Sequence, residues 1–374
     1  MIIVNLFPVA KGGGLQNAFS LLTALKKSEL TDYQCLVRKG SDLELYCQEN
    51  DIKFESFGSG LFGRLLFEFF YARRVCLKNN AKVIFTLFGN CPILSGKSIK
   101  ISGFARSNVV EKDKKFWNFL PRYKRMIKRI NDLLILQLMK LSDVVILETE
   151  RLGRLSSQNK VFGDAKVRVV KMAASGLIVD QLGCIETVKL EDMQTINITY
   201  ITGSHPNKNI PLLAPLFHFL NINCLNKSFN LICTLPNDDY FMEVKSAFNR
   251  LNIEQHLTNG GFLSSNDIPK IISESHALIN VAYLESFSNN WVESWAAKRL
   301  LICRDAEYAH DSCFDSAIYV DLNEPEISAK KILTIFESQA KFDQYTAQGS
   351  KLLEQMPNSN EKFQQYMEII NEFL

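Results

Sequence analysis

Short apolar runs rich in β-branched residues alternate with amphipathic segments along the whole chain. Segments such as 15–27 and 326–338 carry apolar residues at helical spacing between these runs. Such alternation is typical of βαβ units built around parallel sheets, so it predicts an α/β fold with two doubly wound sheets in tandem. The apolar runs lie at 1–7, 33–37, 82–87, 98–103, 143–148 and 167–171, and again at 195–202, 229–234, 277–282, 299–303 and 317–320.

The length of the chain and one polar interruption predict two domains. The chain has 374 residues, and a domain ordinarily holds about 100–200. The region 176–194 is polar and shows little periodicity. We therefore expect an N-terminal domain over 1–180 and a C-terminal domain over 190–357. We also expect a last helix over 358–374, preceded by the capping residues in "PNSNE", to pack back on the N-terminal domain.

Composition excludes several classes of protein. The formal net charge of +3 is too small to indicate a nucleic-acid binder by itself. The nine cysteines never form a C-x-x-C pair, which argues against a disulfide framework or a zinc ribbon and fits a reducing cytosol. No basic segment precedes the first apolar run, and no uncharged apolar stretch reaches the roughly 18–20 residues that span a bilayer. We expect neither a signal peptide nor a membrane-spanning helix.

Two glutamates flank a small polar loop in the second half of the chain. Residues 284–296 read "LESFSNNWVESWA", with Glu285 after a buried strand and Glu293 inside the helix that follows. In open α/β sheets ligands bind beyond the carboxyl ends of the strands. Ser288, Asn289 and Asn290 are good N-cap residues, so the loop would present backbone N–H groups to an anion such as phosphate. Glu293 is expected in the first helical turn, where its carboxylate could accept hydrogen bonds from ribose hydroxyls.

Two further loops follow first strands of the predicted sheets. Residues 200–210, "YITGSHPNKNI", place Lys208 in a strand-to-helix loop beside Gly203, where its charge would suit a diphosphate. A solvated surface lysine is the alternative. In "AKGGGLQN", residues 10–17, Gly12, Gly13 and Gly14 would let the backbone approach a ligand closely, although a flexible turn explains them equally well. They match neither G-x-G-x-x-G nor a P-loop.

Residues 97–129 combine lysines and arginines with aromatic residues, and Glu111 and Asp113 are their acidic residues. This pattern suits an anionic membrane surface, and a solvated helix face is an equally good interpretation. Nucleic acid is disfavoured by the modest overall charge. The five histidines form no H-x-x-x-H pair or Cys/His cluster, and no G-x-S-x-G elbow is present, so neither metal nor serine-hydrolase chemistry is supported. Asp238 and Asp239 fit an acidic turn better than a metal pair.

Together these stretches resemble the retaining, nucleotide-sugar-dependent glycosyltransferases of family 4, the E-x7-E group. "ESFSNNWVESWAAKRLLICRD" is similar to the family signature, "HPNKNI" to its lysine-bearing segment, and "GGGLQNAFSLL" to its amino-terminal glycine loop. The resemblance covers essentially the whole chain and implies the GT-B fold, two Rossmann-like doubly wound domains facing a cleft. It also implies an enzyme that needs no metal or other cofactor.

The resemblance assigns roles to individual residues. Lys208 would bind the diphosphate, Glu293 the ribose, and Glu285 the sugar hydroxyls near the reacting carbon. Gly12–Gly14 would close over the donor from the other domain. The phosphate and donor sugar would be cradled by Ser286, Phe287, Ser288, Asn289 and Asn290, near Gly203.

The chain also departs from the family pattern. Many members carry an arginine just before the lysine segment, where this chain has Ser204 and His205. The N-domain histidine of many members is not evident. "SGFARSN" occupies that region, which makes Arg106 and Asn108 candidate acceptor or donor contacts, with His205 as a further candidate. Ser286 and Ser288 replace two usual glycines, which affects the choice of donor sugar or is simply tolerated.

The sequence as a whole predicts a cytoplasmic glycosyltransferase, peripheral at the inner face of the cell membrane. It would transfer a sugar from a nucleoside diphosphate sugar to a glycan or polyprenyl-diphosphate-linked acceptor with retention, in bacterial polysaccharide synthesis of the O-antigen or capsule type. Two alternatives stay open: a non-catalytic GT-B-like binding protein and a nucleotide-sugar epimerase. A dinucleotide oxidoreductase is disfavoured because neither half has the G-x-G-x-x-G fingerprint.

Overall fold

The computed structural model describes residues 1–10, 13–113, 115–173, 176–191, 193–224, 226–264 and 267–374. The chain divides into two compact units. Unit 1 comprises Met1–Ser175 and Pro357–Leu374, and unit 2 comprises Gly176–Met356. The sequence pattern had placed the first division between 180 and 190 and the second between 357 and 358.

Unit 1 is built on a parallel sheet, seven-stranded in its described residues, in the order β3-β2-β1-β4-β5-β6-β7. Its strands are short and rich in Val, Ile and Phe, as expected for strands covered on both faces. They are β1 (Ile2–Asn5), β2 (Tyr33–Arg38), β3 (Phe54–Phe57), β4 (Val83–Thr86), β5 (Ile99–Gly103), β6 (Val144–Leu147) and β7 (Lys166–Val169).

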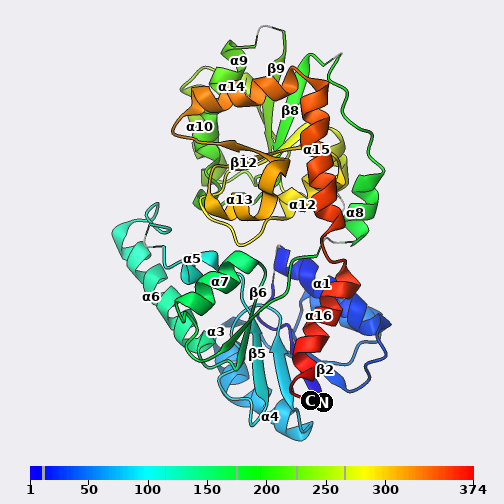
Figure 1. Cartoon of the computed structure of the whole chain (residues 1–374). Coiled ribbons are helices and arrows are strands. Elements are labelled where there is room, and N and C mark those ends of the chain that lie inside the picture. The colour runs from blue at the N-terminus through cyan, green and yellow to red at the C-terminus, as the bar shows by residue number, and fades with distance from the viewer. Residues whose placement is uncertain (11–12, 114, 174–175, 192, 225, 265–266) are drawn as a thin grey trace. The chain divides into compact units, whose positions relative to one another are not determined.

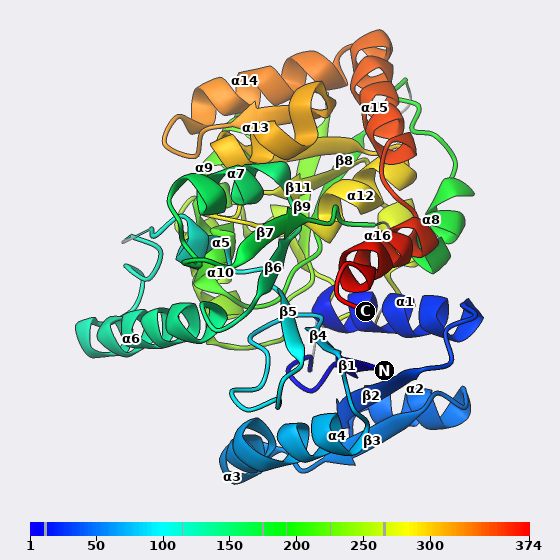
Figure 2. The same ribbon diagram turned by 60° about the horizontal axis from the view of Figure 1, so that its bottom comes forward.

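Helices cover both faces of this sheet (Figures 1 and 2). On one face, α1 (Gly13–Lys27), α2 (Asp42–Glu49) and α16 (Ser359–Asn371) pack on Val4, Val37 and Phe85. On the other face lie α3 (Gly60–Leu66), η1 (Phe67–Tyr71), α4 (Ala72–Lys78), α5 (Ser107–Val110), α6 (Arg122–Met139) and α7 (Glu150–Gln158).

The last helix, α16, begins with the capping chemistry that the sequence predicts. The Asn358 side chain accepts hydrogen bonds from Asn360 N and Glu361 N, and the Glu361 carboxylate accepts one from Asn358 N. This reciprocal capping box satisfies backbone donors that would otherwise lack partners at the helix start. Phe363, Tyr366, Ile369 and Ile370 of α16 belong to the core of unit 1.

Unit 2 repeats the architecture with a parallel sheet of six strands among its described residues, in the order β10-β9-β8-β11-β12-β13. The strands are β8 (Thr195–Tyr200), β9 (Ser228–Cys233), β10 (Leu257–Asn259), β11 (Ala277–Asn280), β12 (Leu300–Arg304) and β13 (Ala317–Val320). Both sheets are doubly wound, because the first strand of each lies inside the sheet and later strands extend on both sides of it.

Helices of unit 2 also cover both faces of its sheet (Figure 1). One face carries α9 (Ala214–Ile222), α10 (Asp239–Asn249) and α14 (Pro325–Phe336), and the other α8 (Gly176–Gly183), α11 (Ile268–Ser273) and α12 (Asn289–Ala296). The remaining helices and helical turns are α13 (Glu307–Cys313), α15 (Gln339–Glu354), η2 (Pro206–Lys208), η3 (Ile210–Leu213), η4 (Glu254–His256) and η5 (Phe314–Ser316).

Candidate functional site

The two loops singled out in the second half of the sequence follow neighbouring strands of unit 2. The loop after β8 contains Gly203, His205 and Lys208, and the loop after β11 contains Glu285. β8 and β11 are hydrogen-bonded neighbours, and the strand order reverses between them. Such a switch point leaves a crevice beyond the carboxyl ends of the strands, where ligands of open α/β sheets bind. The topology therefore brings the two predicted loops together.

Asn207 joins these loops. Its side-chain amide donates to Leu284 O at 3.0 Å and accepts from Leu284 N at 3.3 Å. Its backbone carbonyl accepts from Tyr283 N, and Asn209 in the next turn donates from Nδ2 to Val281 O at 3.0 Å. Asn207 is buried, so the two bonds of its side chain are shielded from water. The loops after β8 and β11 thus form one hydrogen-bonded unit.

The start of α12 is held by two more buried asparagines. Asn280 donates from Nδ2 to Ser288 Oγ at 2.6 Å and accepts from Ala282 N, and Asn290 donates from Nδ2 to Ile201 O at 3.0 Å. Ser288 occupies the N-cap position without making a side-chain capping bond. Because Asn280 engages the Ser288 hydroxyl, that side chain does not cap the first turn of α12.

Lys208 and Glu285 form an ion pair. Lys208 Nζ lies 2.5 Å from Glu285 Oε1, and the two side chains are 24% and 15% exposed. Lys208 is the last residue of η2, and Glu285 directly follows Leu284. The hydrogen bonds between Asn207 and Leu284 therefore hold the two side chains opposite each other. A cation and a carboxylate that solvent and a ligand can still reach thus meet at the carboxyl edge of the sheet.

Glu293 lies deeper. It is the fifth residue of α12, at the start of the second turn, and this corrects the expectation that it would lie in the first turn, because α12 begins at Asn289. Its side chain is 5% exposed, and burial raises the pKa of its carboxyl to about 7. Among the residues that the structure describes, Glu293 Oε2 has no hydrogen-bond partner. A buried oxygen without a partner is costly in a native protein and indicates a place where a ligand can donate a hydrogen bond.

The remaining predicted donor residues surround this pair of loops. Ser286, Phe287 and Asn289 are half-buried, and the Phe287 ring stacks edge-on against Trp291 at 5.1 Å. His205 accepts from Asn207 N and so caps η2. Gly203 is exposed, and a Cβ built on it would meet no atom within 4 Å.

The glycines and the candidate acceptor residues of the first half lie in unit 1. Gly13 and Gly14 are the first residues of α1, and Gly12 lies outside the described residues. Arg106 pairs with Asp132 of α6 at 3.7 Å, and Asn108 donates to the same carboxylate at 2.9 Å. Trp117 Nε1 also donates to Asp132. Arg106 and Asn108 therefore connect α5 to α6, a structural task that the sequence did not indicate.

The basic region 97–129 is not one surface element. It runs through β5, α5, several turns and the beginning of α6. Phe104 is buried in the core, and Lys100 donates from Nζ to Ile93 O. Lysines, arginines and aromatic residues of α6 itself are exposed, among them Tyr123, Lys124 and Lys128.

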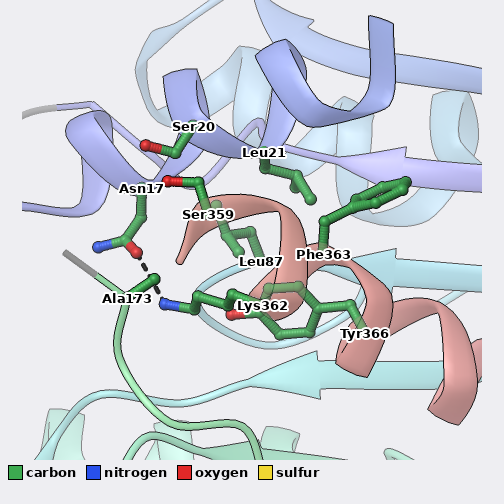
Figure 3. Close-up of a pocket in the computed structure, with 9 residues that line it drawn as sticks. All are labelled: Asn17, Ser20, Leu21, Leu87, Ala173, Ser359, Lys362, Phe363 and Tyr366. Atoms are coloured by element: carbon green, nitrogen blue, oxygen red, sulfur yellow. Dashed lines mark hydrogen bonds between the residues drawn. The ribbon is translucent and has the colours of Figure 1, made fainter. Parts of the chain in front are cut away.

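Unit 1 holds a second cluster of titratable groups, around a small cavity of about 20 Å³ (Figure 3). Lys362 of α16 is buried there and donates from Nζ to Asn17 Oδ1 of α1 at 2.8 Å. Burial lowers the pKa of Lys362 to about 8, although the nearby Glu148 carboxylate acts in the opposite direction. Burial also disfavours the charged form of Glu148, and this raises the pKa of its carboxyl. The hydrogen bond between Lys362 and Asn17 joins α16 to α1. The cavity beside it has room for about a single water molecule.

Within the described residues, no three His, Cys, Asp or Glu side chains lie close enough together to hold a metal ion. Asp238 instead caps α10, where its Oδ1 accepts from Phe241 N. In the same part of the chain, no helix has both the length and the apolar composition needed to cross a membrane.

Comparison with known proteins shows the fold. No protein-family model and no curated protein sequence matches the chain. The crystal structure of a glycosyltransferase from Rickettsia africae is similar, with 16% identity and a TM-score of 0.75 over 100% of this chain and 98% of that one. HepE from Anabaena, in complex with UDP-glucose, has 14% identity and a TM-score of 0.69 over 100% of both chains.

A third similar structure is sucrose-phosphate synthase from Thermosynechococcus elongatus, with 13% identity and a TM-score of 0.69 over 99% of this chain and 98% of that one. These similarities confirm the predicted fold class, an α/β chain of two Rossmann-like domains, which is the GT-B fold of glycosyltransferases.

Two of the three asparagines that assemble the site, Asn207 and Asn280, were not predicted from the sequence, and Asn290 was predicted only as a capping and donor-loop residue. A short polar side chain near a strand end gives no sign of its distant hydrogen-bond partners, such as Leu284 for Asn207 and Ile201 for Asn290. A signal was present at Asn280, since an amide that ends an apolar run such as "ALIN" has to find a hydrogen-bond partner when buried.

Proposed function

We propose that this protein is a glycosyltransferase that moves a sugar from a nucleoside diphosphate sugar to an acceptor, with retention. The observation that supports it most is the arrangement in unit 2, where an accessible Lys208–Glu285 pair and the buried Glu293 flank one loop at the sheet switch point. Because HepE of the same fold was solved with UDP-glucose, we take uridine diphosphate sugars as the first donors to test.

The chemistry of the reaction suits these residues. Breaking a glycosyl–phosphate bond builds negative charge on the departing diphosphate, and Lys208 with the N-terminus of α12 would stabilise that charge. Glu293 would accept hydrogen bonds from the ribose, which would satisfy its unpartnered Oε2. Glu285 would hold hydroxyls of the donor sugar. In this proposal the diphosphate displaces Glu285 from Lys208, and no metal is required.

The proposed acceptor is a glycan or a polyprenyl-diphosphate-linked glycan, as in the synthesis of bacterial surface polysaccharides. An acceptor of the second kind lies at a membrane, and the basic region 97–129 would contact its anionic surface. Support comes from the exposed lysines, arginines and aromatic residues where this region enters α6. The protein would therefore work in the cytoplasm at the inner face of the cell membrane.

Thermal shift measurements with UDP, GDP, ADP and CDP, each with and without its common sugars, test the donor site. One nucleotide family should raise the melting temperature of the wild type. Glu293→Gln should lose that response, because an amide cannot serve as a carboxylate acceptor for two ribose hydroxyls. Glu243→Gln, an exposed glutamate of α10, is the matched control and should respond like the wild type.

Product analysis then distinguishes transfer from its alternatives. Incubation of the responding donor with a lipid-linked glycan should extend the glycan, with the anomeric configuration of the donor kept. Donor binding without any product would favour a non-catalytic binding protein. Conversion of the donor sugar in the absence of acceptor would identify an epimerase. Flat thermal responses to every nucleotide would contradict the donor site itself.

A further inference from the structure

The segment 60–78 of unit 1 forms a helical surface that the candidate site does not use. It consists of α3, η1 and α4 in succession. One side of it is anchored, because Phe67, Val75 and Cys76 pack on Ile3 and Ile84 of the sheet. The anchoring leaves the opposite side of the segment to face outward.

That outward side is apolar. Leu61 is 81% exposed, Phe62 is 74% exposed and Phe70 is 65% exposed, so large hydrophobic side chains are exposed at both the start and the middle of the segment. Phe70 also lines an open groove of about 610 Å³, whose other apolar walls are formed by Phe69, Leu77 and Leu94. Several large exposed apolar side chains within one short segment indicate an interaction surface.

The same surface is positively charged. Arg73, Arg74 and Lys78 line the groove and are exposed. Among the described residues, no carboxylate lies within ion-pair distance of these three cations. Glu68, the acidic residue of the segment, is half-buried. Its carboxylate accepts hydrogen bonds from Asn90 Nδ2 and Ile93 N and forms an ion pair with Arg64. Apolar side chains and uncompensated cations therefore alternate on one face.

We propose that segment 60–78 docks on the surface of an anionic phospholipid membrane. Leu61, Phe62 and Phe70 would enter the boundary between headgroups and acyl chains, and the three cations of the groove would contact lipid phosphates. Charge complementarity supports a membrane as the partner, since a helix with bulky apolar residues beside arginine and lysine suits the surface of a membrane with anionic lipids. The proposal concerns a region separate from 97–129 and does not rest on glycosyl transfer.

The sheet register adds a geometric argument. Ile84 of β4 is paired with Ile3 of β1 on one side and with Lys100 of β5 on the other. Two residues further along β5, Ser102 is paired with Val145 of β6. Side chains two apart on a strand share a face, so α4, which packs near Ile84, and α6, which packs near Val145, cover the same face of the sheet. Helix α6 also exposes apolar residues, including Met126, Ile127 and Leu133, beside its basic ones. Two amphipathic helical surfaces thus lie on one side of unit 1 (Figure 1).

Vesicle sedimentation with the full-length protein tests the proposal. Wild type should bind vesicles that contain phosphatidylglycerol and bind vesicles of pure phosphatidylcholine much more weakly. Arg73→Glu combined with Arg74→Glu should lower the partition coefficient by roughly tenfold or more, because each surface cation contributes about fivefold. Phe62→Ser combined with Phe70→Ser should lower it similarly and leave a weaker, salt-sensitive attachment.

Matched variants on the other face of the sheet provide the control. Leu45→Ser replaces an exposed leucine of α2, and Lys26→Glu with Lys27→Glu reverses two cations at the end of α1. These should bind vesicles nearly as well as the wild type. Equal binding by all variants, or no binding of anionic vesicles by the wild type, would overturn the proposal. Self-association of the wild type that Phe62→Ser with Phe70→Ser abolishes, without vesicle binding, would assign the surface to a second copy and also overturn it.

Discussion

Glu293 places a carboxyl group where a negative charge is costly. Burial raises its pKa from 4.5 to about 7, so the folded chain holds this proton more tightly than the unfolded chain does. The stability associated with that proton is fully present below about pH 4.5 and is lost as the pH rises through about 7. At alkaline pH the folded protein therefore contains a buried charge that a ligand could compensate.

Glu293→Gln should make the protein more stable than the wild type at about pH 8, by up to roughly 3 kcal/mol, and change stability little at about pH 5. The amide keeps the shape of the side chain and carries no charge to bury. Melting temperatures of both proteins at the two pH values measure the effect. A stability difference that is the same at both values would contradict the assigned pKa.

The proposed ribose contact makes donor affinity depend on pH. Hydroxyl groups that donate to the ionised Glu293 favour the form without the proton, so binding should release a proton near neutral pH. We expect a uridine diphosphate sugar to bind several-fold more tightly at about pH 8 than at about pH 6, because the carboxyl titrates near pH 7. Titration calorimetry in two buffers of different ionisation enthalpy would reveal the released proton. Affinity that is independent of pH would argue against the contact.

Lys208 should matter for the reaction more than for the fold. Its ion pair with Glu285 is partly exposed, so Lys208→Met should lower the free energy of unfolding by only about 1 kcal/mol. Turnover should fall by roughly a hundredfold to a thousandfold, because the proposed mechanism then loses its fixed cation at the leaving diphosphate. Activity assays beside thermal melts separate the two effects. A variant with full turnover would remove Lys208 from the proposed mechanism.

At the scale of elements, the loops after β8 and β11 behave as a single piece because Asn207 connects them. Asn207→Ala would leave the N–H and C=O of Leu284 without partners in a buried place, which should cost about 2 kcal/mol. The same change should weaken donor binding, since Lys208 and Glu285 lose their common support. Asn249→Ala, at the exposed end of α10, is the control and should have little effect. Unchanged nucleotide binding by Asn207→Ala would show that the loops hold their geometry independently.

Elements with strong periodicity were predictable, and those supported by tertiary contacts were not. The runs at 82–87 and 143–148 correspond to β4 and β6, and the capping residues at 357–361 correctly located the start of α16. The short edge strands β3 and β10 escaped notice, since their few half-buried residues carry little pattern. Helix α15 was also missed, because its residues are largely polar and few of them are buried.

The same distinction applies to the site. Glu285, Glu293 and Lys208 could be singled out because a strand end followed by a helix start has a local signature. The contact between Lys208 and Glu285, by contrast, joins residues 77 positions apart and depends on which strands are neighbours. The local sequence pattern does not reveal the order of the strands in the sheet. The burial of Glu293 likewise follows from packing that no spacing rule contains.

At the scale of the whole molecule, the chain builds two units whose cores depend on different segments. Unit 1 includes residues 357–374, although unit 2 precedes them in the sequence. Phe363, Tyr366, Ile369 and Ile370 complete its core, and Lys362 is bound to Asn17 of α1 (Figure 3). Lys208, Glu285 and Glu293 all belong to unit 2. The last helix should therefore be essential for one unit and dispensable for the other.

Truncation after Met356 should destabilise unit 1 severely and leave unit 2 folded. Each of the four buried side chains contributes roughly 1.5–3 kcal/mol, and their sum approaches the whole stability of an ordinary domain. Hydrogen exchange should show lost protection in β1, β4 and α1, with protection in β8, β11 and α12 retained. Nucleotide binding should survive and turnover should not. Uniform loss of protection in both units would show that they fold as one cooperative body, and the stability of the proposed donor site would then depend partly on unit 1.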